Sequence, residues 1–180
     1  MNGKPRPDKF FTSLGSGRAY ETLQRTSHSR PDDVTGGAAS AAPPPSPALD
    51  CTGFEFFECP TLLRLQGQWT AVKIVRDGQS LPPVMLRTGI RVATKNEIHI
   101  SFGGQTMIQA LVRLDECTDP MHVDYYNTGG ACKGAIQYGL LKWIGDEACF
   151  CMAAPGQPRP GDFTCLAASG CTFSQWRLKK

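Results

Sequence analysis

The sequence predicts an all-β protein, an eight-stranded antiparallel up-and-down barrel preceded by a long extended arm that is disordered or bound to a partner. From residue 67 onward, apolar and polar residues alternate with a period of two, which is typical of strands with one buried face. Short turns that contain Gly, Asn or Asp separate these segments. Because the strands follow one another with almost no helix between them, a barrel is favoured over a sandwich.

The chain divides into three parts by composition. Residues 1–50 contain Pro43-Pro44-Pro45 and Gly36-Gly37 but little apolar periodicity, so this segment is expected to be an extended arm. Residues 51–66 form a bridge in which Thr61 is expected to cap a short helix. Residues 67–180 are expected to form the barrel.

Eight strands are expected in the barrel, and their apolar faces are expected to point into the lumen. The connection of residues 79–88 contains Pro82-Pro83, which a central strand does not tolerate, so it is expected to lie over one barrel mouth. The expected strands cover residues 68–76, 90–95, 97–103, 106–115, 122–126, 134–144, 148–153 and 172–178.

Charge and hydropathy exclude several classes. A formal net charge of +3 without a clustered Lys/Arg footprint argues against nucleic-acid binding. Charges interrupt every apolar run before it reaches the roughly 18 residues of a membrane-spanning helix, so the only membrane association expected is peripheral, through a partner. The first residues show no apolar core of a secretory signal. A soluble or peripheral protein, organellar or cytoplasmic, is therefore expected.

Eight cysteines are many for a cytosolic domain, but their spacing does not indicate metal binding. No Cys-x-x-Cys occurs, and the three histidines form no closely spaced pair. Cys149 and Cys151 lie two apart in an apolar strand, so both should lie on one face as small buried hydrophobic residues. No metal and no cofactor are expected.

Two segments, LQGQW at 65–69 and GDEACFCMAAPGQPRPGDF at 145–163, carry a family resemblance. With Gly67-x-Trp69 and Arg177 in the last strand, residues 63–180 resemble the uncharacterised lipocalin-like, calycin-type domain family abundant in planctomycete bacteria. The resemblance implies a barrel in which Trp69 closes the floor and Arg177 packs across its ring, but it implies no reaction. The matching residues are Gly67, Trp69, Asp77, Gly78, Ile136, Tyr138, Gly145, Asp146, Cys151, Arg159, Pro160, Phe163 and Arg177.

No catalytic motif is present. The best constellation for general acid–base chemistry is His99, His122, Asp124, Tyr125 and Tyr126, but the two histidines and the aspartate fall on the strand face expected to point outward. An exposed strand face is the preferred interpretation, and the protein is expected not to be an enzyme. Arg159, followed by Pro160, is expected to fix its loop through loop carbonyls or Asp162 rather than to clamp an anion.

Two functions remain open from the sequence. The preferred one is a non-enzymatic interaction module, an accessory subunit that its N-terminal arm tethers to protein partners in a larger assembly. The alternative is a carrier of a small apolar ligand in the barrel lumen, which rests on analogy between folds. Either a ligand or a partner is expected to contact Trp143, Tyr138, Phe102 and Ile100, and one of Trp143 and Tyr138 should face the lumen.

Overall fold

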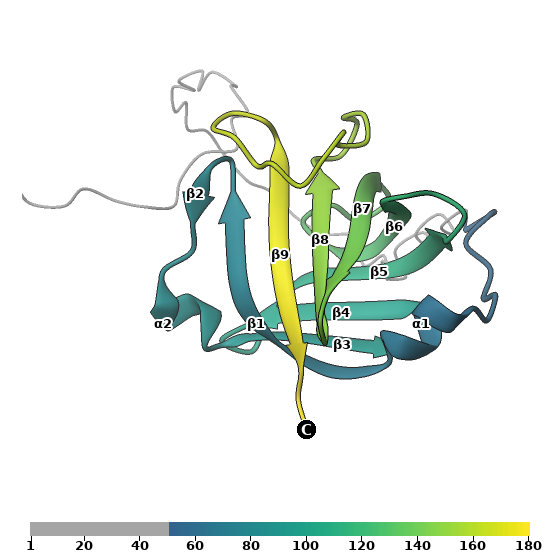
Figure 1. Cartoon of the computed structure of the whole chain (residues 1–180), viewed down its shortest axis with the longest axis horizontal. Coiled ribbons are helices and arrows are strands. Elements are labelled where there is room, and N and C mark those ends of the chain that lie inside the picture. Colours follow the sequence, from purple (N-terminus) through teal and green to yellow (C-terminus); the bar gives the residue numbers. More distant parts are fainter. Residues whose placement is uncertain (1–50) are drawn as a thin grey trace, which may run out of the picture. The chain divides into compact units, whose positions relative to one another are not determined.

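The structure, a computed structural model, describes residues 51–180, and the predicted arm of residues 1–50 lies outside this range. The described part contains a closed antiparallel barrel of eight strands (Figure 1). Closure arises because the first barrel strand, β1 (Gly67–Arg76), pairs with β3 (Gly89–Thr94) on one side and with the last strand, β9 (Cys171–Leu178), on the other. The predicted fold class is therefore confirmed.

The remaining barrel strands follow one another in chain order, each antiparallel to its neighbour. A ninth, short strand, β2 (Gln79–Ser80), lies outside the barrel and pairs only with the end of β1. The barrel is completed by β4 (Glu97–Phe102), β5 (Gln105–Asp115), β6 (Met121–Gly130), β7 (Ile136–Ile144) and β8 (Glu147–Ala153).

A five-residue helix, α1 (Pro60–Arg64), closes one end of the barrel. The expected cap was wrong: the helix begins after Cys59, with Pro60 in its first turn, and Thr61 lies inside it. Pro is favoured there because the first helical N–H groups have no partner within the helix. The free amide of Thr61 instead donates to Glu116 Oε1 at 2.7 Å, which ties the helix to the connection after β5.

A second short helix, α2 (Pro83–Leu86), lies in the connection that was expected to lie over a barrel mouth. Leu81 and Leu86, on either side of this turn, pack against the core cluster. Pro82 precedes the helix in an extended conformation and makes no ladder hydrogen bond. The connection therefore covers the barrel beside the start of β3 and the end of β4 (Figure 1).

The lumen is filled mainly by large side chains. The expectation that apolar residues point inward fails in β3, where Arg91 and Ala93 are buried while Val92 is 36% exposed. The cross-strand register explains this, since Arg91 lies opposite Trp69 in β1 and Ile100 in β4. Residues directly opposite one another share a face of the sheet.

The strand expected over residues 122–126 is longer than predicted, and the turn that follows it lies further along the chain. Strand β6 continues through Gly129 and Gly130, which pair with Gln109 and Ile108 of β5. The chain reverses only over residues 131–134, where the amide of Gly134 donates to the carbonyl of Asn127. Glycine dipeptides fit turns, but they also fit a strand end at which the backbones approach closely.

Candidate functional site

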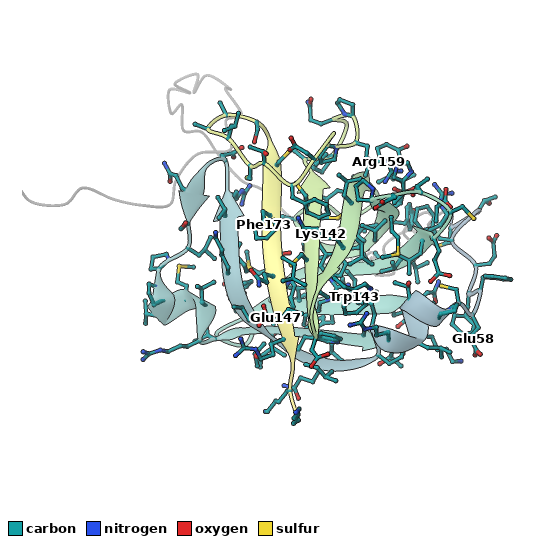
Figure 2. The ribbon with its side chains drawn as sticks, viewed as in Figure 1. Glu58, Lys142, Trp143, Glu147, Arg159 and Phe173 are labelled. Atoms are coloured by element: carbon teal, nitrogen blue, oxygen red, sulfur yellow. The ribbon has the colours of Figure 1, made fainter. Side chains whose placement is uncertain are left out.

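The barrel floor is built from two tryptophans and α1. Trp69 is 2% exposed, and its indole Nε1 donates to the carbonyl of Leu65, just after the helix, at 2.8 Å. The Trp143 ring lies 6.1 Å from the Trp69 ring, centroid to centroid. Arg64, the last residue of α1, places its guanidinium carbon 3.6 Å from the Trp143 centroid. Figure 2 labels Trp143 at this end of the barrel.

Arg177 does not pack across the Trp69 ring as the resemblance implied. Its side chain is 66% exposed on the outer face, where it forms an ion pair with Glu147 of β8. Cross-strand pairing explains the difference, because Arg177 lies opposite Thr70, whose side chain faces away from the lumen. The cation over the floor aromatics is supplied by Arg64 instead. Gly67 begins β1 with a φ of 103°, a value that favours glycine.

A cation lies in the middle of the lumen. Arg91 is 1% exposed, and its Nη1 donates to the hydroxyl of Tyr125 at 2.7 Å. Its guanidinium carbon lies 4.1 Å from the centroid of Phe150 and 5.7 Å from that of Tyr125. An aromatic face stabilises a cation by roughly 0.5–2 kcal/mol, which does not replace a counter-charge.

Three N–H donors in this interior have no acceptor among residues 51–180. They are Nε and Nη2 of Arg91 and the indole Nε1 of Trp176, which is also 1% exposed. The one buried amide oxygen without a donor belongs to Asn127, whose amide nitrogen is held by Ala135 and Gln137. Buried donors are almost always paired, so these three donors are exceptional. Two of them belong to a single guanidinium group.

The residues expected to contact a ligand lie on both faces of the wall. Ile100 is buried in the lumen opposite Arg91, and Phe102 packs against the core near the α2 end. Trp143 faces the lumen at the floor. Tyr138 lies on the outer face, 36% exposed, with the Arg159 guanidinium carbon 5.5 Å from its ring centroid.

The outer wall over β5, β6 and β7 carries an ion network centred on Asp124. Its side chain is 8% exposed, and Arg113 Nη2 donates to Oδ2 at 2.8 Å. Arg159 Nη2 lies 2.7 Å from Oδ1, as an ion contact without hydrogen-bond geometry. Arg159 also donates to the carbonyls of Gly139 and Val123. Together with Leu114, Asp115 and His122, these three charged residues line a surface pocket of about 350 Å³.

Arg159 therefore fixes its segment through other partners than expected. The carbonyls belong to strands β6 and β7, not to the loop, while Asp162 accepts from the amide of Thr164. Pro160 and Phe163 lie in the same segment between β8 and β9, and the Phe163 ring makes an edge contact with Phe173 of β9. Figure 2 shows Arg159 at this edge of the barrel.

Replacing Arg159 by Ala is expected to lower the free energy of unfolding by about 2 kcal/mol, because hydrogen bonds to charged groups contribute roughly 1.5–3 kcal/mol. Arg177→Ala is the matched control: it removes an arginine from an exposed ion pair, worth under about 1 kcal/mol. Urea titration of both variants measures the difference. Equal losses would mean that Arg159 does not anchor the segment.

The constellation considered for acid–base chemistry is divided between the two faces of the sheet. Tyr125 points into the lumen toward Arg91, whereas Asp124 is bound by two arginines on the outer face. His99 contacts Thr106 at 2.9 Å on the outer face of β4. Tyr126 packs against Phe54 of the bridge. The side chains are therefore not gathered around a single reacting centre.

The cysteines in β8 are covered from outside. Cys149 and Cys151 point away from the lumen but are 0% exposed. Cys165, in the segment between β8 and β9, and Cys171, the first residue of β9, lie near Cys151. No disulfide joins any of the eight cysteines, all of which fall within the described range. Burial raises the pKa of the Cys149 thiol and raises that of Cys151 to about 12.

At pH 8, iodoacetamide is expected to modify Cys117 first and to leave Cys149 and Cys151 unmodified in the native protein. The thiolate is the reactive form, and a raised pKa keeps the buried thiols protonated while Cys117 is exposed. Peptide mass mapping after timed labelling provides the measurement, with urea-unfolded protein as the control. Early labelling at residue 149 or 151 would contradict the burial of this strand.

An exposed apolar surface, here called the end surface, lies beside α1 and is formed by Phe56, Phe57 and Leu63. Phe57 is 80% exposed, Leu63 55% and Phe56 47%. The segment is held in place by Phe54, which is buried against Tyr126 and whose carbonyl accepts from Asn96. A groove of about 230 Å³ lies along it, lined by Phe56, Glu58, Leu62, Leu63, Gln66 and Lys95.

Neither helix in the described range is long or apolar enough to cross a membrane. Within residues 51–180, no group of three or more His, Cys, Asp or Glu side chains is arranged to hold a metal ion.

The fold and the lumen define a closed antiparallel β-barrel with a cationic, aromatic interior. The chain matches no protein-family model, and comparisons with curated proteins and with solved structures found no similar protein.

Proposed function

We propose that the protein is a small-molecule-binding barrel that holds a compact ligand in its lumen. The observation that carries this proposal is the set of three buried N–H donors without an acceptor, two on Arg91 and one on Trp176. Leaving a buried donor unpaired costs roughly 1–3 kcal/mol, more for a charged group. A ligand with acceptor atoms among these donors would offset that cost.

This proposal reverses the order that the sequence favoured. The extended arm favoured an interaction module over a carrier, but the arm lies outside the described residues. The lumen residues belong to strands that are paired on both sides. Donors on such rigid elements are held in position before a ligand binds, which lowers the entropic cost of binding.

Titration with benzamide, an uncharged aromatic compound with one carbonyl acceptor, tests the proposal. Trp69 and Trp176 belong to the buried core and Trp143 packs against it, so binding is expected to change the fluorescence saturably at one equivalent. The unfolding midpoint should rise with ligand concentration, because the ligand binds only the folded state. If neither benzamide nor its charged analogue benzoate produces a saturable change in fluorescence, the proposal is overturned.

The variant Trp176→Phe is expected to weaken benzamide binding, since it removes the indole donor but keeps an aromatic ring. Tyr138→Phe is the control, because it removes a polar group from a ring on the outer wall. Equal affinities of the two variants would place the binding site outside the lumen.

A second candidate function is a protein-interaction module, and the end surface favours it. Large apolar side chains exposed together on an ordered segment are typical of docking surfaces. The expected partner is a protein with an apolar pocket for the Phe57 ring. This function would also give a role to the arm, which precedes the bridge of residues 51–66 in the sequence.

A photoreactive residue at position 57 tests this second function, with position 84 as the control because Val84, in α2, is 70% exposed. A discrete cross-linked adduct from residue 57, absent from residue 84 and lost on Leu63→Ser, supports docking at the end surface. Comigration of the full chain with a large particle, lost on removal of residues 1–50, would support the tether. Equal cross-linking at both positions would count against the end surface.

The likeness to the lipocalin-like family is also part of this proposal. Gly67 and Trp69 occupy the positions at the start of β1 that the resemblance implies, and Trp69 lies at the barrel floor. The chain differs from the family pattern in one respect: Arg64, and not Arg177, places its guanidinium over an aromatic ring of the floor.

A further inference from the structure

The Arg91 guanidinium uses one of its three nitrogens and leaves the other two together on one edge. Nη1 donates to Tyr125, whereas Nε and Nη2 have no acceptor in the described part of the chain. The N–H groups of Nε and Nη2 point the same way and form the side-on fork of an arginine. This fork matches the two oxygens of a carboxylate in a bidentate pair.

In the part of the chain that the structure describes, no ion pair compensates the charge of Arg91. The ion pairs found among residues 51–180 join Arg113 and Arg159 to Asp124, and Arg177 to Glu147, all on the outer face. Arginine does not lose its proton in proteins, so the charge is permanent. A buried ion is normally paired with an opposite charge. A ligand that is only polar would satisfy the donors but not this charge.

The size and shape of the lumen restrict the rest of the ligand. Its largest fully buried side chains include Trp69, Trp176, Tyr125 and Phe150, together with Arg91 itself. These side chains occupy much of the interior, and their rings favour offset or edge contacts with another ring. At the α2 end, Phe102, Leu81 and Leu86 are only partly buried.

We propose that the lumen binds a compact aromatic carboxylate, with its two oxygens on the Nε and Nη2 fork of Arg91 and its ring among the lumen aromatics. This inference rests on the proposed function and names the ligand class for the same site. In this proposal Trp176 Nε1, the other buried donor without an acceptor in the described residues, binds an acceptor of the same ligand. The α2 connection covers the end through which such a ligand would pass.

Three probes test the ligand class on the full-length chain: benzoate, benzamide and palmitate. Benzoate is expected to bind at least tenfold more tightly than benzamide, since charge-assisted hydrogen bonds are about twice as strong as neutral ones. Palmitate carries the same carboxylate on a long chain and is expected to bind more weakly than benzoate. Chloride at equal concentration controls for an inorganic anion.

Two variants of Arg91 distinguish the contribution of its two-nitrogen fork to benzoate binding from the contribution of its positive charge. Arg91→Met is expected to abolish the preference for benzoate over benzamide, and Arg91→Lys to keep only part of it because an ammonium has no fork. Arg87→Met is the control: Arg87 is exposed beside α2, so its loss removes one positive charge without touching the lumen. Arg87→Met should keep the full preference.

A direct measurement covers the case in which the Arg91 variants do not fold. In the wild-type chain, benzoate should shift the NMR signals of the Arg91 Nε–H and the Trp176 Nε1–H, and benzamide should shift that of Arg91 less. If benzamide binds as tightly as benzoate, the carboxylate inference is wrong while lumen binding stands. Tighter palmitate binding overturns the compact ligand, and an equal effect of chloride overturns the organic acid. If no probe binds, the proposed function fails as well.

Discussion

Replacing Trp69 by Ala is expected to lower the free energy of unfolding by about 3–5 kcal/mol, the range for removing a large buried aromatic side chain. The indole is 2% exposed, lies near the tilted ring of Trp143 and donates to the carbonyl of Leu65. Its loss would leave a cavity at the barrel floor and an unpaired carbonyl just after α1. Urea unfolding followed by circular dichroism gives the value directly.

Trp69→Phe provides the matched control. It keeps an aromatic ring in the floor but removes the indole donor, so the expected loss is smaller, about 1–2 kcal/mol. Combining Arg64→Ala with Trp69→Phe should lower the free energy of unfolding only slightly further, because the Arg64 guanidinium contacts Trp143 rather than Trp69. A loss under about 1 kcal/mol for Trp69→Ala would mean that the floor does not depend on this ring.

The period-two pattern predicted the barrel because residue alternation is a local property of each strand. Strands such as β4, in which Ile98 and Ile100 alternate with Glu97 and His99, show the pattern in full. Their neighbours in the chain are also their neighbours in the sheet. Local patterning and chain order were therefore enough to fix the topology of the eight strands.

The alternating pattern could not predict that Arg91 is buried in the lumen. In the sequence, Ile90 and Val92 look like the buried face of their strand, with Arg91 on the exposed one. The face that points inward was decided by register: pairing with Trp69 and Ile100 turns Arg91 into the lumen. A signal was present in the small residues Gly89 and Ala93, which share the face of Arg91 and leave room for a long side chain.

The floor cation was missed for a related reason. The resemblance placed an arginine of the last strand over Trp69, but the strand face of residue 177 is set by its pairing with Thr70. Arg64 takes the place because α1 lies over the floor and its last residue reaches Trp143 and the carbonyl of Gly145. The position of α1 depends on contacts distant in sequence, such as that between Thr61 and Glu116.

The alternating pattern of the strands also did not predict which outward-facing side chains are buried by other segments. Asp124 and Tyr126 belong to the outward face of β6, yet both are buried. Arg159 from the segment between β8 and β9 covers the first, and Phe54 of the bridge covers the second. An alternating pattern describes which way a side chain points, not what a distant segment places over it.

Gly130→Ala is expected to lower the free energy of unfolding by about 3 kcal/mol. The residue ends β6 with a φ of 79°, where a side chain costs roughly 1–2 kcal/mol. A Cβ there would overlap the carbonyl oxygen of Met107 and lie 3.0 Å from its carbonyl carbon. Those atoms belong to the backbone of β5, which cannot move without disturbing the ladder, so overpacking adds about 1–3 kcal/mol.

Gly134→Ala separates the backbone cost of a positive φ from the steric overlap with β5. Gly134 has a φ of 83°, and a Cβ at this position would meet nothing within 4 Å. Both glycines flank the same β6–β7 connection, so their substitutions act on one local structure. Gly134→Ala should cost only the backbone term, about 1–2 kcal/mol, and the difference between the variants measures the contact with β5. Urea unfolding with equal slopes for the two variants gives this difference. Equal losses would show that β5 and β6 separate at this point and that β6 ends before Gly130, as the sequence pattern predicted.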